Sequence, residues 1–351
     1  MNMERPASIL VTGGAGYIGS HVVCQLGERG ERLVVLDNLS TGNADALLYG
    51  ELVVGDVGDA ELLDAIFREH RIEAVMHFAA KIVVPDSVAH PLDYYDNNTC
   101  RSRVLLEACR RARVPHFVFS STAAVYGDPP GGVADENTPP APQNPYGRSK
   151  LMTEWMLGDL ARVTPLRYVV LRYFNVAGCD LKGRIGQDTP NATHLIKVAC
   201  QHALGARPYL EVFGTDYSTP DGTCVRDYIH VDDLAAAHLA ALDHLRAGGE
   251  SLTVNCGYGH GYSVREVINV LRRLHEGQLE VRDAPRREGD MPMIIADAGL
   301  ARRRLGWKPR HDDLPLIVSS ALAWERKRLA QPLVKSVPRK RQSDAVEELG
   351  G

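Results

Sequence analysis

The sequence lacks three features that mark other classes of protein. No apolar run reaches the roughly 20 residues of a membrane span, and residues 1–8 hold no apolar signal core. The seven cysteines form no Cys-x-x-Cys motif, so neither a disulfide framework nor a metal site is indicated. We therefore expect a cytoplasmic protein without a metal, in which the cysteines are mostly small core residues.

An excess of charge of one sign is also missing. Lys and Arg total 40 and Asp and Glu total 44, which gives a net charge of −4. This balance argues against a general nucleic-acid binder, so we expect neither nucleic acid nor membrane among the partners. The 351 residues, 44% hydrophobic and 24% charged, suffice for one large or two modest globular domains.

Short apolar runs alternate with helical patterns through the first half of the chain. The runs predict strands at 9–11, 33–36, 52–54, 74–78, 116–119 and 168–171. The patterns between them predict helices at 18–29, 60–70, 92–113 and 147–163. Strands that alternate with helices and are apolar on both faces are typical of a doubly wound parallel sheet. We therefore predict an α/β fold of the Rossmann type.

Three glycines, Gly13, Gly16 and Gly19, stand between the first expected strand and the first expected helix. Glycine allows a tight turn and lets the backbone approach a pyrophosphate, while the helix N-terminus offers free N–H groups to that anion. Asp37 ends the second expected strand. A carboxylate there can bind the adenosine ribose and repel a 2′-phosphate, although it is also an ordinary turn residue. The pattern predicts a dinucleotide site that favours NAD over NADP.

Two further strand ends are candidates for the same site. Asp56 follows the third expected strand, where its carboxylate can meet the adenine amine. The alternative for Asp56 is a helix N-cap, a position that Asp favours. Ala79 and Ala80 end the fourth run, where small side chains leave room for the cofactor diphosphate. We expect His77, just before them, to be a core histidine.

Tyr146 and Lys150 are four residues apart, so on a helix they share one face. A free tyrosine has a pKa of about 10 and is a poor base. A neighbouring ammonium and a positive nicotinamide favour its phenolate. Pro145 suits the first turn of this helix. The pair alone is also compatible with an ordinary surface helix.

The strand expected at 116–119 runs into Ser120, Ser121 and Thr122. These hydroxyls therefore stand at the carboxyl end of a parallel strand, where doubly wound sheets bind ligands. Thr122 can hydrogen-bond a reacting oxygen, although a single hydroxyl here is often a cap or turn residue. Combined with Tyr146, Lys150 and the glycine turn, the pattern predicts oxidation of an alcohol, or reduction of a ketone, with a nicotinamide.

The pattern changes after Asn175. Glycine, proline and polar residues become frequent through 178–192, and helices are expected near 193–204, 232–247, 263–274 and 314–329. We predict an NAD-binding Rossmann domain over 1–175 and a smaller, mostly C-terminal substrate lobe over 176–330. Residues 226–256 are expected to return in part to the sheet, and 331–351 to form a disordered tail.

Longer motifs carry a resemblance to a known family. They are VTGGAGYIGSH at 11–21, YYDNN at 94–98, SSTAAVYG at 120–127, LRYFN at 171–175, DGTCVRDYIHV at 221–231 and RREGD at 286–290. With them the chain resembles the extended short-chain dehydrogenase/reductases, and within that group the UDP-glucose 4-epimerase (UDP-galactose 4-epimerase) family. The resemblance runs from about residue 8 to about residue 328.

The resemblance implies an isomerase that interconverts UDP-glucose and UDP-galactose, in galactose metabolism or in the supply of UDP-galactose for polysaccharide. It implies that Tyr146 takes the O4 proton while the C4 hydride passes to tightly bound NAD. Thr122 steadies the oxygen, and Lys150 bonds the nicotinamide ribose. The 4-keto sugar then rotates about its pyrophosphate linkage and is reduced on the other face, so NAD is recycled in each turnover. A homodimer formed through helices 92–113 and 147–163 is also implied.

The resemblance further implies two sets of binding residues. For the cofactor they are Gly13, Gly16, Tyr17, Ile18, Gly19, Asp37, Asn38, Ser40, Thr41, Gly42, Asp56, Val57, Phe78, Ala79, Ala80, Asn97, Ser120, Tyr146, Lys150, Tyr173 and Phe174. For the UDP-hexose they are Thr122, Tyr146, Asn175, His194, Leu195, Phe213, Arg226, Tyr228, Arg287, Asp290 and Ile294. Arginine suits the diphosphate because its planar fork pairs with phosphate oxygens. A solvated charge is the alternative for Arg287, and the family varies at His194.

The sequence departs from the family pattern at two places. A lysine common two residues after Ala80 is replaced by Ile82, and Lys81 comes one position earlier, so we leave Lys81 out of the site. At Ile294 some members have a bulky tyrosine and others a small residue, and this choice affects whether an N-acetyl group fits. Because isoleucine is intermediate in size, we expect UDP-glucose and UDP-galactose to be preferred, with weak turnover of UDP-N-acetylhexosamines.

Other functions on the same fold remain open at this point. A 4,6-dehydratase needs an extra acid and base, and its relatives carry Asp-Glu after the threonine, whereas Ala123 and Ala124 follow Thr122 here. A decarboxylase also needs a carboxylate near that strand. A net NAD-dependent nucleotide-sugar dehydrogenase would release NADH. A nucleotide-sensing binding protein is the alternative outside enzymes, since fold does not fix function.

Overall fold

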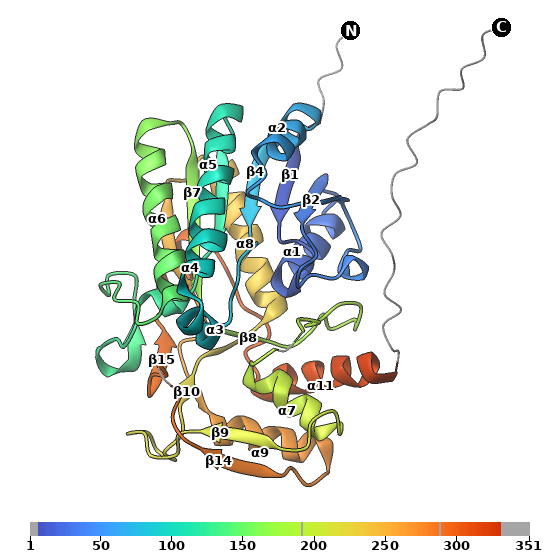
Figure 1. The fold of residues 1–351 in the computed structure, drawn as a ribbon, viewed down its shortest axis with the longest axis vertical. Helices are drawn as coiled ribbons and strands as arrows, with labels where there is room; N and C mark the ends of the chain where they lie inside the picture. Colours follow the sequence, from blue (N-terminus) through green and yellow to red (C-terminus); the bar gives the residue numbers. More distant parts are fainter. Residues whose placement is uncertain (1–5, 191, 288, 331–351) are drawn as a thin grey trace, which may run out of the picture.

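The structure is a computed structural model that describes residues 6–190, 192–287 and 289–330. Figure 1 shows a large α/β part with a smaller lobe beneath the ends of its strands. The expected tail at 331–351 lies outside the described residues.

Seven parallel strands form the main sheet, in the order β12-β7-β5-β4-β1-β2-β3. Their bounds are β1 Ser8–Thr12, β2 Leu33–Asp37, β3 Glu51–Val54, β4 Ile72–His77, β5 His116–Ser120, β7 Arg167–Tyr173 and β12 Leu252–Cys256. From β1 the chain adds β2 and β3 on one side of the sheet, and it then returns to the other side of β1 to add β4, β5, β7 and β12. The predicted Rossmann-type α/β fold is therefore confirmed, and its ligand crevice is expected at the carboxyl ends of β1 and β4.

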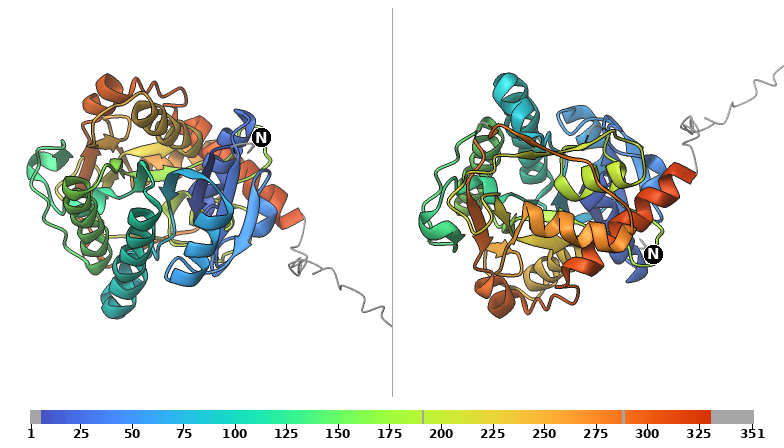
Figure 2. Two further views of the ribbon diagram at one scale, coloured as in Figure 1. Left: turned by 90° about the horizontal axis from the view of Figure 1, so that it is seen from above. Right: turned by 90° about the horizontal axis from the view of Figure 1, so that it is seen from below.

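Helices cover both faces of this sheet, as the view from above in Figure 2 shows. They are α1 Tyr17–Glu28, α2 Ala60–Glu69, α5 Arg101–Ala112, α6 Pro145–Val163 and α8 Val231–Arg246. One apolar layer takes Leu63, Leu105 and Leu157 from α2, α5 and α6. The other takes Val22 and Leu234 from α1 and α8. Two covered faces explain why the strands read as continuous apolar runs.

The helix expected over 92–113 is not one regular α-helix. Short helices α3 Val84–Ala89 and α4 Pro91–Tyr94 precede a π-helical stretch, η2 Tyr95–Cys100, which leads into α5. The backbone carbonyl of Asn98 accepts hydrogen bonds from the Ser102 hydroxyl, at 2.5 Å, and from the Thr153 hydroxyl, at 3.3 Å. Side-chain hydroxyls thus compete with the regular backbone ladder, which accounts for the irregular turn.

The smaller lobe is built from short elements. Its helices are α7 Leu195–Ala203, α9 Val264–His275, α10 Gly299–Leu305 and α11 Leu314–Ala330. Two strand pairs are β8 Asn175–Ala177 with β11 Tyr228–His230, and β9 Leu210–Phe213 with β14 Val281–Ala284. A four-stranded sheet joins β13 Tyr262–Ser263, β10 Val225–Arg226, β15 Met293–Ala296 and β6 Val133–Ala134. The described 3₁₀ turns all come before residue 175 in the chain. They are η1 Ala44–Ala46, η3 Ala123–Val125 and η4 Pro130–Gly132.

The expected return of 226–256 to the main sheet holds for part of that segment. β12 is the edge strand beside β7, and α8 packs against α1, β5 and β7. Residues 228–230 pair with β8 instead. The division into a domain over 1–175 and a lobe over 176–330 remains a prediction. Among the described residues, no helix has both the length and the apolar character to cross a membrane.

Candidate active site

One large cavity, of about 1260 Å³, lies between the carboxyl edge of the main sheet and the smaller lobe. Its wall contains every residue that the sequence predicted for cofactor and substrate, except Lys150. Lys150 lies beneath that wall and is 2% exposed. The volume exceeds the roughly 300–1,000 Å³ of a pocket for one small molecule. The cavity can therefore accommodate a cofactor and a substrate together.

The glycine turn lies at one end of the cavity, where Gly16 caps α1. Gly13 has a φ of +71°, and a Cβ atom there would lie 2.5 Å from the backbone nitrogen of Ala79. A Cβ at Gly19 would lie 2.3 Å from the Gly13 carbonyl oxygen. Any side chain at these positions would collide with backbone, so the turn needs glycine. The close backbone and the free N–H groups of α1 fit a pyrophosphate.

Asp37 is buried at the end of β2, beside this turn. Its carboxylate accepts hydrogen bonds from the backbone N–H of Ala15, at 2.9 Å, and of Leu39, at 2.8 Å. Burial raises the pKa of Asp37, while these two N–H groups oppose the rise. A carboxylate retains further lone pairs beyond these two bonds, so Asp37 can still accept from a ribose diol.

Asp56 does not cap a helix, because Asp59 is the N-cap of α2. Its carboxylate accepts from the Gly58 N–H, at 2.8 Å, the Asn38 amide, at 2.9 Å, and the Arg101 guanidinium, at 2.5 Å. Burial opposes ionisation, but these partners together hold the pKa of Asp56 below its usual range. Asp56 therefore faces the cavity as a fixed anion.

Tyr146 stands on the first turn of α6, where Asn144 caps the helix by accepting from the Gly147 N–H at 2.9 Å. The Thr122 hydroxyl lies close enough to the Tyr146 phenol to oppose the rise of its pKa. Thr122 also caps η3, since its hydroxyl accepts from the Ala124 N–H at 3.2 Å. The hydroxyl and the phenol thus share one point of the cavity wall, beside the carboxyl end of β5.

Lys150 follows one turn later on α6 and is turned toward β5. Its ammonium donates to the Ser120 carbonyl at 2.9 Å and lies 4.9 Å from the centroid of the Phe119 ring. The Ser120 hydroxyl donates to the Tyr173 phenol at 3.0 Å. Lys150 is thus held at the strand end that also carries Thr122.

The electrostatics differ from the sequence-based expectation. Burial raises the pKa of Tyr146 well above its usual value, and the hydrogen bond from Thr122 only opposes this rise. Burial also lowers the pKa of Lys150 to about 7, although the Glu154 carboxylate opposes that shift. Burial thus penalises both charged forms, so the Lys150 ammonium favours a phenolate only against this cost.

The opposite wall of the cavity belongs to the smaller lobe. The Arg287 guanidinium lies 3.6 Å from the centroid of the Phe213 ring, so Arg287 is a wall residue rather than a freely solvated charge. Arg226 faces Asp290, with 3.6 Å between nitrogen and oxygen. Ile294 pairs in register with Arg226 between β15 and β10 and is 4% exposed. Two arginines and an aromatic ring fit a nucleotide diphosphate and its base.

His77 lies where the sequence placed it, whereas Lys81, which was left out of the site, lines the cavity. His77 is buried and exchanges hydrogen bonds with the hydroxyls of Thr12, at 2.6 Å, and Ser102, at 2.8 Å, as a core histidine does. Burial lowers the pKa of His77 to about 3. Lys81 pairs with Asp93 at 3.3 Å, and both side chains are largely exposed.

Several wall residues were not found from the sequence. Asn144 precedes Pro145, and an N-cap before a proline is a recognised helix start, so this signal was available. Arg101 meets Asp56 across 45 positions of sequence, and no local pattern announces such a contact. Gln187 lies in an irregular segment and likewise has no sequence signal.

Comparison with known proteins identifies the family. Residues 9–257 match the model of the NAD dependent epimerase/dehydratase family. The chain is 59% identical over 319 residues to the UDP-glucose 4-epimerase of Azospirillum brasilense. The aligned residues make up 91% of this chain and 92% of that protein.

Solved structures agree with that comparison. UDP-glucose 4-epimerase from Brucella ovis in complex with NAD matches with a TM-score of 0.88 and 45% identity, over 90% of this chain and 98% of that one. The UDP-Glc/GlcNAc 4-epimerase of Campylobacter jejuni matches with a TM-score of 0.80 and 46% identity, over 92% and 100%. The chain therefore belongs to the NAD dependent epimerase/dehydratase family.

Proposed function

We propose that this protein is an NAD-dependent 4-epimerase that interconverts UDP-glucose and UDP-galactose. The observation that carries the proposal is one cavity whose wall joins the Gly13 turn, the Thr122–Tyr146 pair and the Arg287–Phe213 stack. A cofactor site, a proton-transfer group and a nucleotide anchor are the three parts that such a reaction needs. The names of the relatives described above support the same activity.

The residues present fit NAD. The Gly13 turn leaves no space for a Cβ atom, the start of α1 offers N–H groups, and Asp37 keeps acceptor capacity for a ribose. When bound at these residues, NAD would supply the oxidising power for C4 of the sugar. Its positive charge also favours the phenolate that burial of Tyr146 disfavours.

The protein's own residues then provide the acid–base chemistry and the anchor. Tyr146 accepts the proton of the sugar O4 and gives it back when the ketone is reduced. Thr122, whose hydroxyl lies beside that phenol, turns its single O–H to the same sugar oxygen. Arg226 and Arg287 hold the diphosphate, so that the hexose can turn while the nucleotide stays bound.

Two alternatives receive less support. A 4,6-dehydratase needs a further acid and base beside the threonine, and Ala123 and Ala124 line the cavity at that point. A net dehydrogenase would release NADH into solution. Measurement of free NADH during turnover separates it from an epimerase, which keeps its cofactor.

The sugar preference is the finer part of the proposal. Buried Ile294 is intermediate between the large and small residues of the family, so UDP-glucose and UDP-galactose are preferred over UDP-N-acetylhexosamines. Assays of purified enzyme with UDP-galactose and with UDP-N-acetylgalactosamine, read by chromatography, test both the epimerase activity and the sugar preference. Conversion of UDP-galactose at the higher rate supports the proposal. Equal rates contradict the preference, and no conversion of either sugar contradicts the function.

A homodimer and a cytoplasmic location complete the proposal. Leu92 on α4 and Trp155 on α6 are apolar and are 77% and 60% exposed, on helices that pack together. A second copy of the chain would cover them. The described cysteines are all free, which fits a reducing compartment. Light scattering gives the molar mass, and a mass of about twice the 38.5 kDa chain supports the dimer.

A further inference from the structure

A buried ion pair lies directly behind one wall of the cavity. Lys197 of α7 and Glu325 of α11 form it, and each side chain is 6% exposed. A buried pair contributes little net stability, because taking two charges out of water costs about as much as their attraction returns. Its other contacts are therefore more informative than its contribution to folding.

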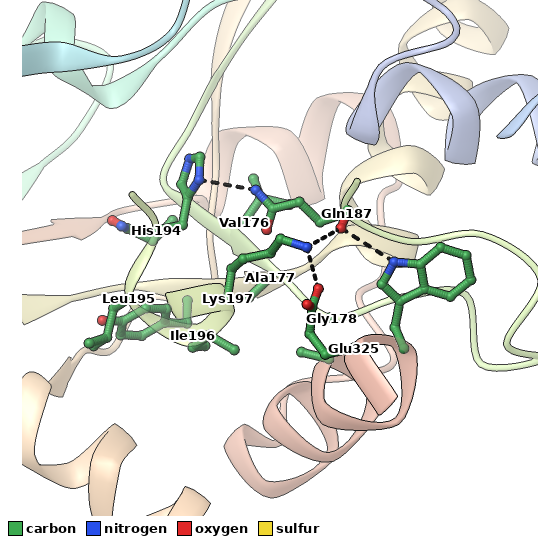
Figure 3. A pocket seen from close by; sticks show the side chains of 13 residues that line it. Val176, Ala177, Gly178, Gln187, His194, Leu195, Ile196, Lys197 and Glu325 are labelled. Carbon is green, nitrogen blue, oxygen red and sulfur yellow. Dashed lines mark hydrogen bonds and ion pairs between the residues drawn. The ribbon is translucent and has the colours of Figure 1, made fainter. Parts of the chain in front are cut away.

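The pair holds the backbone of Gln187, as Figure 3 shows. The Lys197 ammonium donates to the Gln187 carbonyl at 2.6 Å, and the Trp324 indole N–H donates to the same oxygen at 3.3 Å. Gln187 lies between β8 and α7 in a segment without regular structure. Donors from α7 and α11 therefore set the position of this segment where it meets the cavity.

The side chain of Gln187 in turn fixes His194. The Gln187 amide nitrogen lies 3.0 Å from Nδ1 of His194, and Figure 3 shows the two side chains facing each other. An amide NH₂ group only donates, so Nδ1 accepts and the neutral ring carries its proton on Nε2. Burial, with help from the Lys197 charge, lowers the pKa of His194, which keeps the ring neutral.

A small chamber lies between the Lys197–Glu325 pair and the large cavity. Its volume is about 20 Å³, which suffices for one water molecule but not for a larger group. Six residues line both spaces: Asn175, Val176, Gln187, His194, Leu195 and Tyr228. The Lys197–Glu325 pair thus lies one layer behind the wall that faces the substrate.

We propose that Gln187 is a positioning residue for the UDP-sugar, and that the Lys197–Glu325 pair holds Gln187 in place. Gln187 fixes His194 as the Nε2–H tautomer, so that the wall offers one N–H donor to an oxygen of the bound UDP. This inference rests on the proposed function for the identity of the ligand. Its effect falls on binding of the nucleotide, not on the transfer of hydride or proton.

The first test is the affinity for UDP itself, measured by calorimetry, which does not require turnover. Loss of one neutral hydrogen bond predicts about fivefold weaker binding for Gln187→Ala. The same variant raises KM for UDP-galactose by a similar factor and leaves kcat within about twofold. Gln25→Ala is the matched control, because that amide bonds the Asp232 carbonyl on α8 at 3.0 Å. Equal UDP affinity for Gln187→Ala and the parent protein would overturn the inference.

A second variant gives a signature that a purely structural role would not produce. In Gln187→Glu a carboxylate faces Nδ1, so it raises the pKa of His194 and draws the ring proton to Nδ1. As pH rises from 6 to 8, the imidazolium loses its Nε2 proton and UDP affinity falls. The parent protein loses no affinity through His194 over this range. An equally flat profile for the variant contradicts the tautomer assignment.

The groups that face His194 are few among the described residues. Lys197, paired with Glu325, is the charged group that acts on His194. Tyr228 lines the same two spaces and stays neutral, because burial raises its pKa. The double variant Lys197→Met with Glu325→Leu replaces the pair by apolar side chains of similar size, which often leaves stability unchanged. We expect a melting temperature near that of the parent and UDP affinity about threefold weaker, since one of two donors to Gln187 is lost.

The outcomes separate the two proposals. Unchanged UDP affinity in a stable double variant would remove the pair from the inference. A parent protein that binds UDP but converts no UDP-galactose rejects the proposed function alone. Equal UDP affinity in the parent protein and Gln187→Ala, with full conversion of UDP-galactose, rejects the positioning role alone.

Discussion

At the residue scale, burial sets the protonation of the proposed catalytic pair. Burial raises the pKa of Tyr146 and lowers the pKa of Lys150 to about 7, so both shifts favour the neutral forms. Glu154, four residues after Lys150 on α6, is the carboxylate that opposes the shift of Lys150. It is itself buried, accepts the Ser121 hydroxyl at 2.5 Å and pairs with Arg172. The charge state of the site therefore depends on a buried network behind it.

The first prediction concerns the phenol. In Tyr146→Phe the group that exchanges the O4 proton is lost, so we expect kcat to fall by about 100- to 10,000-fold. UDP affinity and bound NAD remain within about twofold, because the ring still fills its place. Tyr49→Phe, at a partly exposed position outside the cavity, is the control. Undiminished turnover by the Tyr146 variant would remove this residue from the mechanism.

The second prediction concerns the pH profile of kcat. Glu154→Gln removes the carboxylate that raises the pKa of Lys150, so that pKa falls further below about 7. If the ammonium form is the active one, the basic limb of the profile moves to lower pH. The variant is expected to be less stable, because Arg172 loses its buried partner. Rates are therefore measured below its melting temperature. Glu61→Gln on the surface of α2 is the control, and identical profiles would exclude this role of Glu154.

At the element scale, the site is a product of strand ends and helix starts. The turn from β1 to α1, the ends of β2 and β4, and the start of α6 all reach the cavity from the main sheet. The strands, most helices and the site residues at these junctions could be predicted, because periodicity and glycine spacing are local signals. The π-helical stretch of η2 could not, since it depends on the Thr153 hydroxyl from another helix.

The third prediction tests the glycine turn. Gly13→Ala places a Cβ atom 2.5 Å from the Ala79 backbone nitrogen, so the turn must move and the purified protein should lose most of its bound NAD. Gly30→Ala is a matched control, because φ there is +79° but no atom lies within 4 Å of the added carbon. The control costs about 1–2 kcal/mol of stability and keeps NAD. Equal NAD content in both variants, read from absorbance after denaturation, would contradict the assignment.

The fourth prediction concerns the start of α8. Burial, with Asp180 nearby, raises the pKa of Asp232 to about 6, against about 3.9 in an unfolded chain. The folded state therefore binds the proton more tightly, and stability falls as pH rises from about 4 to 6. Asp233 and His311 also face this group.

Asp232→Asn removes the buried charge and should stabilise the protein by about 2 kcal/mol above pH 6. The gain vanishes near pH 4, where the parent Asp232 is protonated. Melting temperatures across pH 4–8 measure it, with the exposed Asp159→Asn as control. A gain that is independent of pH would show that charge is not its cause.

At the scale of the whole molecule, the cavity exists only because two parts of the chain close on it. Asp56 meets Arg101 across 45 positions, and Lys197 meets Glu325 across 128. Each contact joins elements that meet only in the folded chain, the end of β3 with α5 and α7 with α11, so no local pattern announces it. The residues implied by the family resemblance nevertheless meet at one cavity, with Lys150 directly beneath its wall.

In the proposed reaction, hydride leaves C4 and returns to the same sugar without leaving the protein. The most direct test is to incubate purified protein, without added NAD, with UDP-galactose that carries deuterium at C4. We expect UDP-glucose with the deuterium still at C4, no crossover of label to unlabelled substrate, and no free NADH. Loss of the deuterium, crossover between sugars, or accumulation of NADH would contradict it.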